Sequence, residues 1–361
     1  MKKLLYIGHA FHNKTKSSQF MLDLLKTKYD VTKFDFDPYI DDFEKFKLLK
    51  GMSFDLVVLW QIMPSLKKLS KYIKYKHINF FPMYDNTHSM EISQWKEYLN
   101  CNIINFCNQL HKMCLKCGFS SYYIKYFPKP KEIENFGDPK SLFFWQRINK
   151  INTNLIKKVV ETDKINKFYI HQVPDPKNNI FEIPASFKDK TVVSNWFDSK
   201  SDLDKYIQKS AIYFAPREYE GIGMSFLEAM AMGRCVIAAN NPTMNEYIRH
   251  GETGFLYDIK NPQKIILKNV DEIQTNTYNY INEGYQKFEK EKYKILDWLE
   301  QKPQNDLLKF LSNYFLSIYT KKMILESIFS VKNSSDKKHK IITILGIKIK
   351  IKRKNKHEQR Q

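Results

Sequence analysis

Residues 211–257 read AIYFAPREYEGIGMSFLEAMAMGRCVIAANNPTMNEYIRHGETGFLY, and this stretch decides the fold. An apolar run at 211–216 is followed by a loop with two glycines, a helical pattern over Phe226–Met232 and a second apolar run, Cys235–Ala239. Apolar runs that alternate with helical patterns predict parallel strands joined by crossover helices. The stretch therefore predicts one unit of a doubly wound α/β sheet.

The same alternation extends in both directions along the chain. Strands are expected at 4–8, 54–60, 78–84, 122–127, 142–145, 168–173, 191–194, 211–215 and 235–239. Helical patterns are expected at 18–28, 66–74, 152–162, 201–209, 226–232 and 244–250. The turn-rich segment 127–139 is the predicted linker between two such halves. Because ligands bind beyond the carboxyl ends of parallel strands, we expect the site in a central cleft between two Rossmann-like domains.

Four parts follow from these patterns. We expect a first α/β domain over 1–136, a second over 137–300, C-terminal helices over 301–331 that pack back on the first domain, and a basic tail over 332–361. The helices are expected from the long helical pattern after Ile281, which Pro303 interrupts. In the tail, Ile341–Ile351 alternates isoleucine and lysine, which predicts a strand with one apolar and one cationic face.

The charge of the chain is strongly positive and unevenly spread. Its 361 residues include 59 Lys and Arg against 39 Asp and Glu, a net charge of +20. Residues 332–361 hold eleven basic and two acidic residues, a net charge of +9. Two interpretations stay open: a solvated tail in a lysine-rich protein, or attraction to an anionic membrane or nucleic acid. Nucleic-acid binding is disfavoured, because the tail lacks aromatic residues and the chain has six arginines only.

The sequence shows no targeting or membrane-spanning segment. After Met1–Lys3 the apolar run is only Leu4–Ile7, whereas a secretory signal needs roughly 7–15 apolar residues. No stretch approaches the about 18 apolar residues of a spanning helix. We therefore expect a cytoplasmic protein, with a peripheral position at the inner face of the cytoplasmic membrane as the alternative.

Four side chains with zinc-ligand chemistry lie close together in the sequence: Cys107, His111, Cys114 and Cys117. Their spacing is compressed compared with ordinary zinc sites, and it matches one face of a helix. We expect a helix face packed into a core and no bound metal.

The loop at 217–223 carries the candidate ligand chemistry. Gly221 and Gly223 let the backbone approach a ligand, and the helix that follows offers free N–H groups to a phosphate. Glu220 and Glu228 are placed to accept hydrogen bonds from hydroxyls on either side of a diphosphate. The structural alternative is that Ser225–Glu228 forms a capping box and Glu220 is a turn residue.

This stretch resembles the glycosyltransferases of family 4 (glycosyl transferases group 1), which have the GT-B fold. The shared motifs are Pro216, Glu220–Gly223, Glu228–Gly233, Glu246–Ile248 and Gly251–Leu256. The resemblance implies that Glu220 contacts the transferred sugar and that Glu228 holds the ribose of the nucleotide. It also implies that five consecutive residues bring backbone N–H groups to the donor: Gly221, Ile222, Gly223, Met224 and Ser225.

The family clamps the diphosphate with an Arg and, five residues later, a Lys. Arg147 matches the Arg, but position 152 is Asn152, so Lys150 is the candidate replacement, with a solvated surface lysine as the alternative. The first half of the chain resembles the family weakly, because Gly8–His12 stands where the family has a Gly-Gly loop. The acceptor-side candidates there are Asp85, His88 and His9. The alternative for the two histidines is a structural or solvated role.

The resemblance implies a glycosyltransferase of the hexosyltransferase type. It would move a sugar from a nucleoside-diphosphate donor, bound by 137–300, to a hydroxyl on a glycan or lipid-linked acceptor at 1–136. Retention of configuration, independence of metals and cofactors, and a place in bacterial surface polysaccharide or lipid-linked glycan synthesis are further expectations. The alternatives are a GT-B enzyme without transferase activity, such as a nucleotide-sugar epimerase, and a basic nucleic-acid-binding protein.

Overall fold

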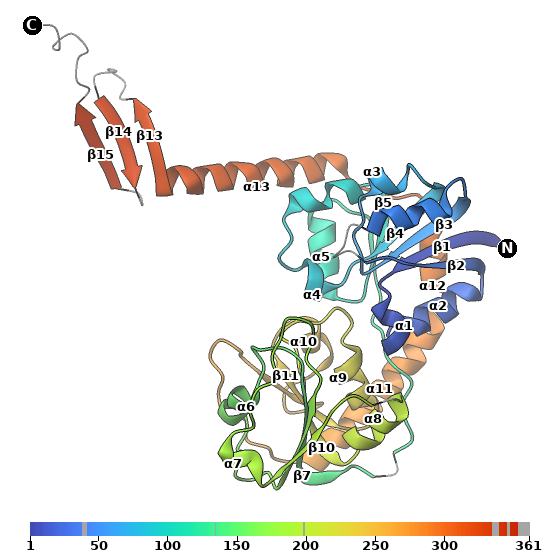
Figure 1. Cartoon of the computed structure of the whole chain (residues 1–361), viewed down its shortest axis with the longest axis vertical. Helices are drawn as coiled ribbons and strands as arrows, with labels where there is room; N and C mark the ends of the chain where they lie inside the picture. Colours follow the sequence, from blue (N-terminus) through green and yellow to red (C-terminus); the bar gives the residue numbers. More distant parts are fainter. Residues whose placement is uncertain (38–41, 134, 198, 334–338, 345–346, 353–361) are drawn as a thin grey trace, which may run out of the picture.

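The computed structural model describes residues 1–37, 42–133, 135–197, 199–333, 339–344 and 347–352. Figure 1 shows two α/β domains, one above the other, joined by a long helix, and an arm that projects from the first domain. The expected doubly wound architecture is confirmed in both domains, because each has a six-stranded parallel sheet.

The first sheet has the strand order β2-β1-β3-β4-β5-β6. Its strands are β1 (Lys2–Gly8), β2 (Tyr29–Asp35), β3 (Ser53–Trp60), β4 (Lys74–Phe81), β5 (Cys101–Asn105) and β6 (Ser121–Tyr123). Its helices are α1 (Phe11–Thr15), α2 (Gln19–Lys26), α3 (Leu66–Leu69), α4 (Tyr84–Thr87) and α5 (Asn108–Lys116), with 3₁₀ turns at Asp42–Leu49 and Ile92–Tyr98. The helix expected over 66–74 ends at Leu69, because β4 already begins at Lys74.

The second sheet has the order β12-β11-β10-β7-β8-β9. Its strands are β7 (Asp138–Gln146), β8 (Lys167–Gln172), β9 (Thr191–Ser194), β10 (Ser210–Phe214), β11 (Cys235–Ala239) and β12 (Phe255–Tyr257). Its helices are α6 (Thr153–Val159), α7 (Ala185–Lys188), α8 (Lys200–Ile207), α9 (Met224–Ala231) and α10 (Met244–Tyr247).

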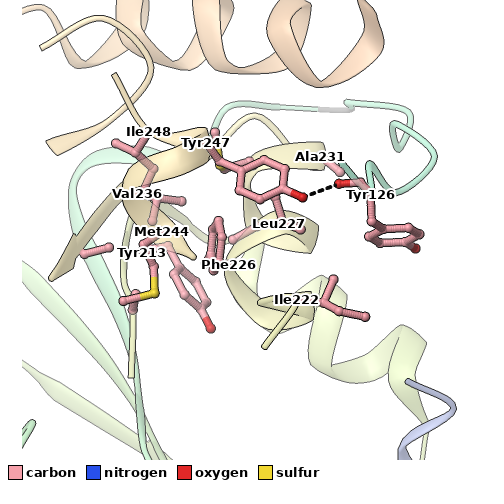
Figure 2. Packing of buried hydrophobic residues seen from close by; sticks show 14 of the residues in the cluster. Tyr126, Tyr213, Ile222, Phe226, Leu227, Ala231, Val236, Met244, Tyr247 and Ile248 are labelled. Atoms are coloured by element: carbon pink, nitrogen blue, oxygen red, sulfur yellow. Dashed lines mark hydrogen bonds between the residues drawn. The ribbon is translucent and has the colours of Figure 1, made fainter. Parts of the chain in front are cut away.

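The core of the second domain gathers around α9. Phe226 and Leu227 on this helix are fully buried and pack among side chains of β10, β11 and α10, as Figure 2 shows. In the same view the Tyr247 hydroxyl donates a hydrogen bond of 2.9 Å to the carbonyl of Tyr126, in the segment that links the two domains. The start of α9 is therefore buried among β10, β11 and α10.

The C-terminal helices return to the first domain earlier than expected. After α11 (Val270–Glu291), helix α12 (Lys294–Leu299) packs on β4 and β5, and the side chain of Asn79 donates to the carbonyl of Leu299. The return thus begins before residue 301, because the apolar face of α12 is buried against the first sheet.

A projecting arm takes up most of the segment 301–331, which was expected to pack back on the first domain, and the beginning of the expected basic tail (Figure 1). Helix α13 (Leu307–Ile328) is anchored on the first domain by the buried Phe310 and leads away from it (Figure 1). It ends in an antiparallel sheet of β13 (Phe329–Asn333), β14 (His339–Ile344) and β15 (Ile347–Lys352). The expected strand over 341–351 is thus two strands; 334–338, 345–346 and 353–361 lie outside the described residues.

The cysteine-rich segment forms a helix, as expected. Cys107 and Cys114 are buried, and the His111 ring lies 2.9 Å from the Ser121 hydroxyl. Among the residues that the structure describes, no three His, Cys, Asp or Glu side chains come together as a metal site. None of the described helices combines the length and the apolar character that crossing a bilayer requires.

Candidate active site

The two domains meet where β4 and β10 end. A Cβ atom on Gly221 would lie 2.6 Å from the Cβ of Met83 and 3.0 Å from Oδ1 of Asp85, so a larger residue would force the domains apart. Next to it, the Tyr219 ring stacks on the His88 ring with centroids 4.4 Å apart. The loop before α9 therefore faces the segment 83–88 of the first domain directly.

Two arginines of the second domain converge on one carboxylate. Arg147 donates from Nε and Nη2 to Oδ1 of Asp175, over 3.0 and 2.7 Å, and Arg217 donates from Nη2 to Oδ2 of the same residue. Arg217 also reaches across to the first domain, with Nη1 3.7 Å from Oδ2 of Asp85. The two guanidinium groups are thus close enough to bind a single anionic group between them.

Glu220 lies beside this pair with its carboxylate available. Burial raises the pKa of Glu220 to about 7, and the nearby Arg217 and Arg147 counteract only part of that effect. Its backbone is fixed, since the Thr243 hydroxyl donates to the carbonyls of Glu220 and Gly221 over 2.8 and 2.9 Å. Within the described chain no side chain donates a hydrogen bond to the Glu220 carboxylate. Burial also raises the pKa of Asp85, with Arg217 opposing that shift.

Helix α9 starts one residue after a glycine in the left-handed region. Gly223 has φ = 88°, and a Cβ there would lie 1.9 Å from the Phe226 ring, so glycine is required. The helix has no side-chain cap. The capping-box alternative for Ser225–Glu228 is therefore wrong, because Ser225 lies inside the first turn. The first N–H groups of α9 remain available to a ligand.

Glu228 is held by a lysine rather than by the helix start. Its carboxylate forms an ion pair with Lys200, which stands at the beginning of α8. Burial raises the pKa of Glu228, and the charge of Lys200 opposes the shift.

Lys150, expected to supply the second diphosphate cation, and the nearby Asn152 both have other partners here. Lys150 is more than half exposed and forms an ion pair of 2.6 Å with Glu218. Asn152 caps α6, because its side chain accepts hydrogen bonds from the N–H groups of Asn154 and Leu155. Asn is a favourable N-cap residue, so position 152 stabilises the start of α6.

The acceptor-side candidates are split. Asp85 and His88 stand at the domain contact, where His88 is exposed and turns Nδ1 toward the carbonyls of Tyr84 and Asp85. His9 lies in the loop after β1, where its Nδ1 accepts from the N–H of Phe11 and its Nε2 is 3.7 Å from Asp37. The structure thus joins Asp85 with Arg147 and Glu220, while His9 belongs to a separate loop.

Sequence reasoning missed Asp175, Arg217 and Lys200. Asp175 follows the carboxyl end of β8 and Arg217 follows that of β10, the places where ligands bind in such sheets. That position was the available signal for both residues. Lys200 carried no signal, because its partner Glu228 lies 28 residues away on another helix.

A further contact between the domains involves Glu246 in α10. Its carboxylate accepts hydrogen bonds from the N–H groups of Asn108 and Gln109 over 2.8 and 3.1 Å, and from the Cys107 thiol over 3.2 Å. A residue of the second domain therefore caps α5 of the first domain, a place where negative charge is favourable.

Comparisons with known proteins relate part of this chain to glycosyltransferases. The model of the family "Glycosyl transferases group 1" matches residues 185–294, which include Glu220 and Glu228. An uncharacterized glycosyltransferase of Haemophilus influenzae is 31% identical over 88 residues, 24% of this chain and 25% of that protein. An uncharacterized 41.2 kDa protein in the cps region of Klebsiella pneumoniae is 25% identical over 139 residues, 38% of each chain. The alignments thus span about a quarter and 38% of these relatives.

The fold as a whole also has a solved counterpart. The sucrose-phosphate synthase of Thermosynechococcus elongatus superposes with a TM-score of 0.51 and 10% identity, covering 90% of this chain and all of that one. At this identity the likeness concerns the fold. With its two doubly wound domains, the chain has the GT-B fold and carries a domain of the glycosyl transferases group 1 family.

Proposed function

We propose that the protein is a glycosyltransferase that moves a sugar from a nucleoside-diphosphate donor to an acceptor hydroxyl. The observation that carries the proposal is the convergence of Arg147 and Arg217 on one carboxylate, beside Glu220. A leaving diphosphate gains negative charge in the transition state, and fixed cations stabilise that charge without reorganisation.

Asp175 acts in this proposal as the partner of both arginines before the donor arrives. Its carboxylate holds the two guanidinium groups in position, and the diphosphate then takes over part of their hydrogen bonds. Arg217 thereby shares the role expected for Lys150. Two arginines supply the positive charge that the leaving group requires, so the proposed reaction is metal-independent.

The two glutamates bind the ends of the donor. Glu220 accepts a hydrogen bond from a hydroxyl of the transferred sugar, for which its carboxylate is available. Glu228 accepts from the ribose hydroxyls and releases Lys200 when they arrive. The N–H groups at the start of α9, after Gly221–Gly223, face the phosphates.

The acceptor binds on the first domain, near Asp85 and His88. Contact of both domains around the reacting atoms aligns donor and acceptor and excludes water. Retention of configuration and a role in surface polysaccharide or lipid-linked glycan synthesis complete the proposal. The Klebsiella relative in the cps region supports that role.

Thermal shifts with UDP, GDP, CDP and ADP and their sugar conjugates test the proposal. A ligand at 100 times its Kd stabilises the folded protein by about 2.7 kcal/mol. We expect one nucleotide to raise the Tm more than the others, and Glu228→Gln to reduce that shift. The control Glu252→Gln, at an exposed ion pair with Arg249, should show the same shift as the wild type. Absence of any nucleotide effect contradicts the proposal. Turnover of a nucleotide sugar without any acceptor would instead indicate an epimerase.

A further inference from the structure

The sheet at the end of the arm has two chemically different faces. Residues paired directly across strands share a face, and the register places Val331 beside Ile342 and Ile342 beside Ile349. Ile344 and Ile347 pair on the same face, and Ile351 pairs with Lys340 at its rim. Lys348 and Lys350 alternate with the isoleucines of β15 and therefore project from the opposite face.

The apolar face is open to solvent. Val331, Ile349 and Ile351 are 46–49% exposed and Ile347 is 69% exposed, although α13 packs against both β13 and β14. Buried Thr343, by contrast, lies on the lysine-bearing face. The helix therefore leaves the apolar face uncovered, and burying that face elsewhere is favourable.

The positive charge of the sheet favours one kind of partner over others. Strands β13, β14 and β15 contain five lysines and no acidic residue, and most of this sheet lies within the segment 332–361 of net charge +9. An anionic partner is favoured, and a second copy would bring like charge toward like charge. The register pairs one aromatic residue, Phe329, with Ile344 on this face, and the other apolar residues there are aliphatic, so the face lacks the succession of aromatic platforms on which nucleic-acid bases stack.

The size of the face also argues against self-association through it. Six-residue strands of about 20 Å and three strands about 4.8 Å apart give a face of roughly 300 Å². A stable interface needs about 800 Å² from each partner. A lipid surface requires no complementary shape, and it offers acyl chains beneath anionic headgroups.

We propose that the apolar face of the β13–β15 sheet docks the protein on an anionic lipid membrane, with Lys340 at the rim and the lysines of β15 at headgroup level. The arm projects from the first domain (Figure 1). In the proposed function this domain binds the acceptor, so docking would hold it beside lipid-linked molecules. Docking itself does not depend on the proposed reaction.

Vesicle flotation of the full chain tests the surface. We expect binding to phosphatidylcholine vesicles that contain phosphatidylglycerol and weak binding to phosphatidylcholine alone. The double variant Ile347→Ser/Ile349→Ser should lose more than about tenfold in affinity because aliphatic burial is lost. Lys348→Glu/Lys350→Glu should lose about tenfold or more. The control Ile266→Ser removes an isoleucine of similar exposure in the second domain and should bind like the wild type.

A depth measurement keeps the proposal testable if the sheet tolerates few changes. Ile349→Trp and Lys348→Trp place a fluorophore on adjacent positions of opposite faces. Brominated lipids should quench the first variant more strongly than the second, relative to the wild type. Equal quenching, or wild-type binding that ignores lipid charge, overturns the proposal. So does a dimer that Ile347→Ser/Ile349→Ser dissociates without loss of vesicle binding. Nucleotide thermal shifts should be unchanged in all variants, which separates this test from that of the proposed function.

Discussion

Replacing Arg217 by Gln removes one of the two charges that converge on Asp175. The substitution keeps much of the side-chain length, so lost charge dominates the effect. A hydrogen bond to a charged group contributes about 1.5–3 kcal/mol, which corresponds to a loss of about 10–150-fold in affinity for a diphosphate. The Arg217 and Asp175 side chains are 25% and 20% exposed, so solvent screens this pair less than an exposed surface pair.

Isothermal titration with a nucleoside diphosphate and with the parent nucleoside measures this loss. We expect Arg217→Gln and Arg147→Gln to lower the affinity for the diphosphate. The affinity for the nucleoside should hardly change, because the nucleoside has no phosphates. Lys150→Gln should change the affinity little, since Lys150 is exposed and paired with Glu218. Arg249→Gln, at an exposed arginine paired with Glu252, is the matched control. Raising the salt concentration should narrow the difference between wild type and Arg217→Gln.

The reverse order of effects would refute the reasoning. If Lys150→Gln weakened diphosphate binding strongly while Arg217→Gln did not, the cation expected from the sequence, although displaced from the family's spacing, would be the functional one. Equal losses for the diphosphate and the nucleoside would show that Arg217 shapes the site without contacting the phosphates.

Two further predictions concern stability. Burial raises the pKa of Glu220 from 4.5 to about 7, so the folded state binds its proton more tightly than the unfolded state, and stability falls as pH rises from about 4.5 to about 7. Glu220→Gln should therefore raise Tm more at pH 8 than at pH 4, and an equal shift at both values contradicts this. Glu246→Gln removes the negative charge from the start of α5 and should cost about 1–2 kcal/mol in urea unfolding. Unchanged stability relative to Glu252→Gln would show that the cap contributes little.

Five of the six strands of the second domain were predictable from sequence, because each contains a short apolar run bounded by turns. β9 and β11 were placed at the residues observed, since each run ends at a polar or turn residue. β2 was missed, because Tyr29–Asp35 is a partly exposed edge strand that mixes charged and apolar residues. β12 was missed because it has only three residues and follows a turn.

The glutamates of the candidate site could be chosen from local sequence, but their partners could not. Glu220 and Glu228 stand in a loop and a helix whose order is visible in one stretch. The contact of Arg217 with Asp175 joins residues 42 positions apart, and its contact with Asp85 joins two domains. Such pairings depend on strand order and domain placement, which local patterns do not encode. They are the part of the site that required the structure.

The cap that Glu246 provides to α5 makes two amide hydrogens sensitive to the position of the domains. The N–H groups of Asn108 and Gln109 have no intrahelical acceptor, and their hydrogen bonds end on a carboxylate of the other domain. Solvent reaches them as soon as the domains separate, even while α5 itself stays folded. The hydrogen-exchange rates of these two amides therefore report the equilibrium between the closed and the open arrangement of the domains. A bound donor that holds the domains together should slow both rates in parallel.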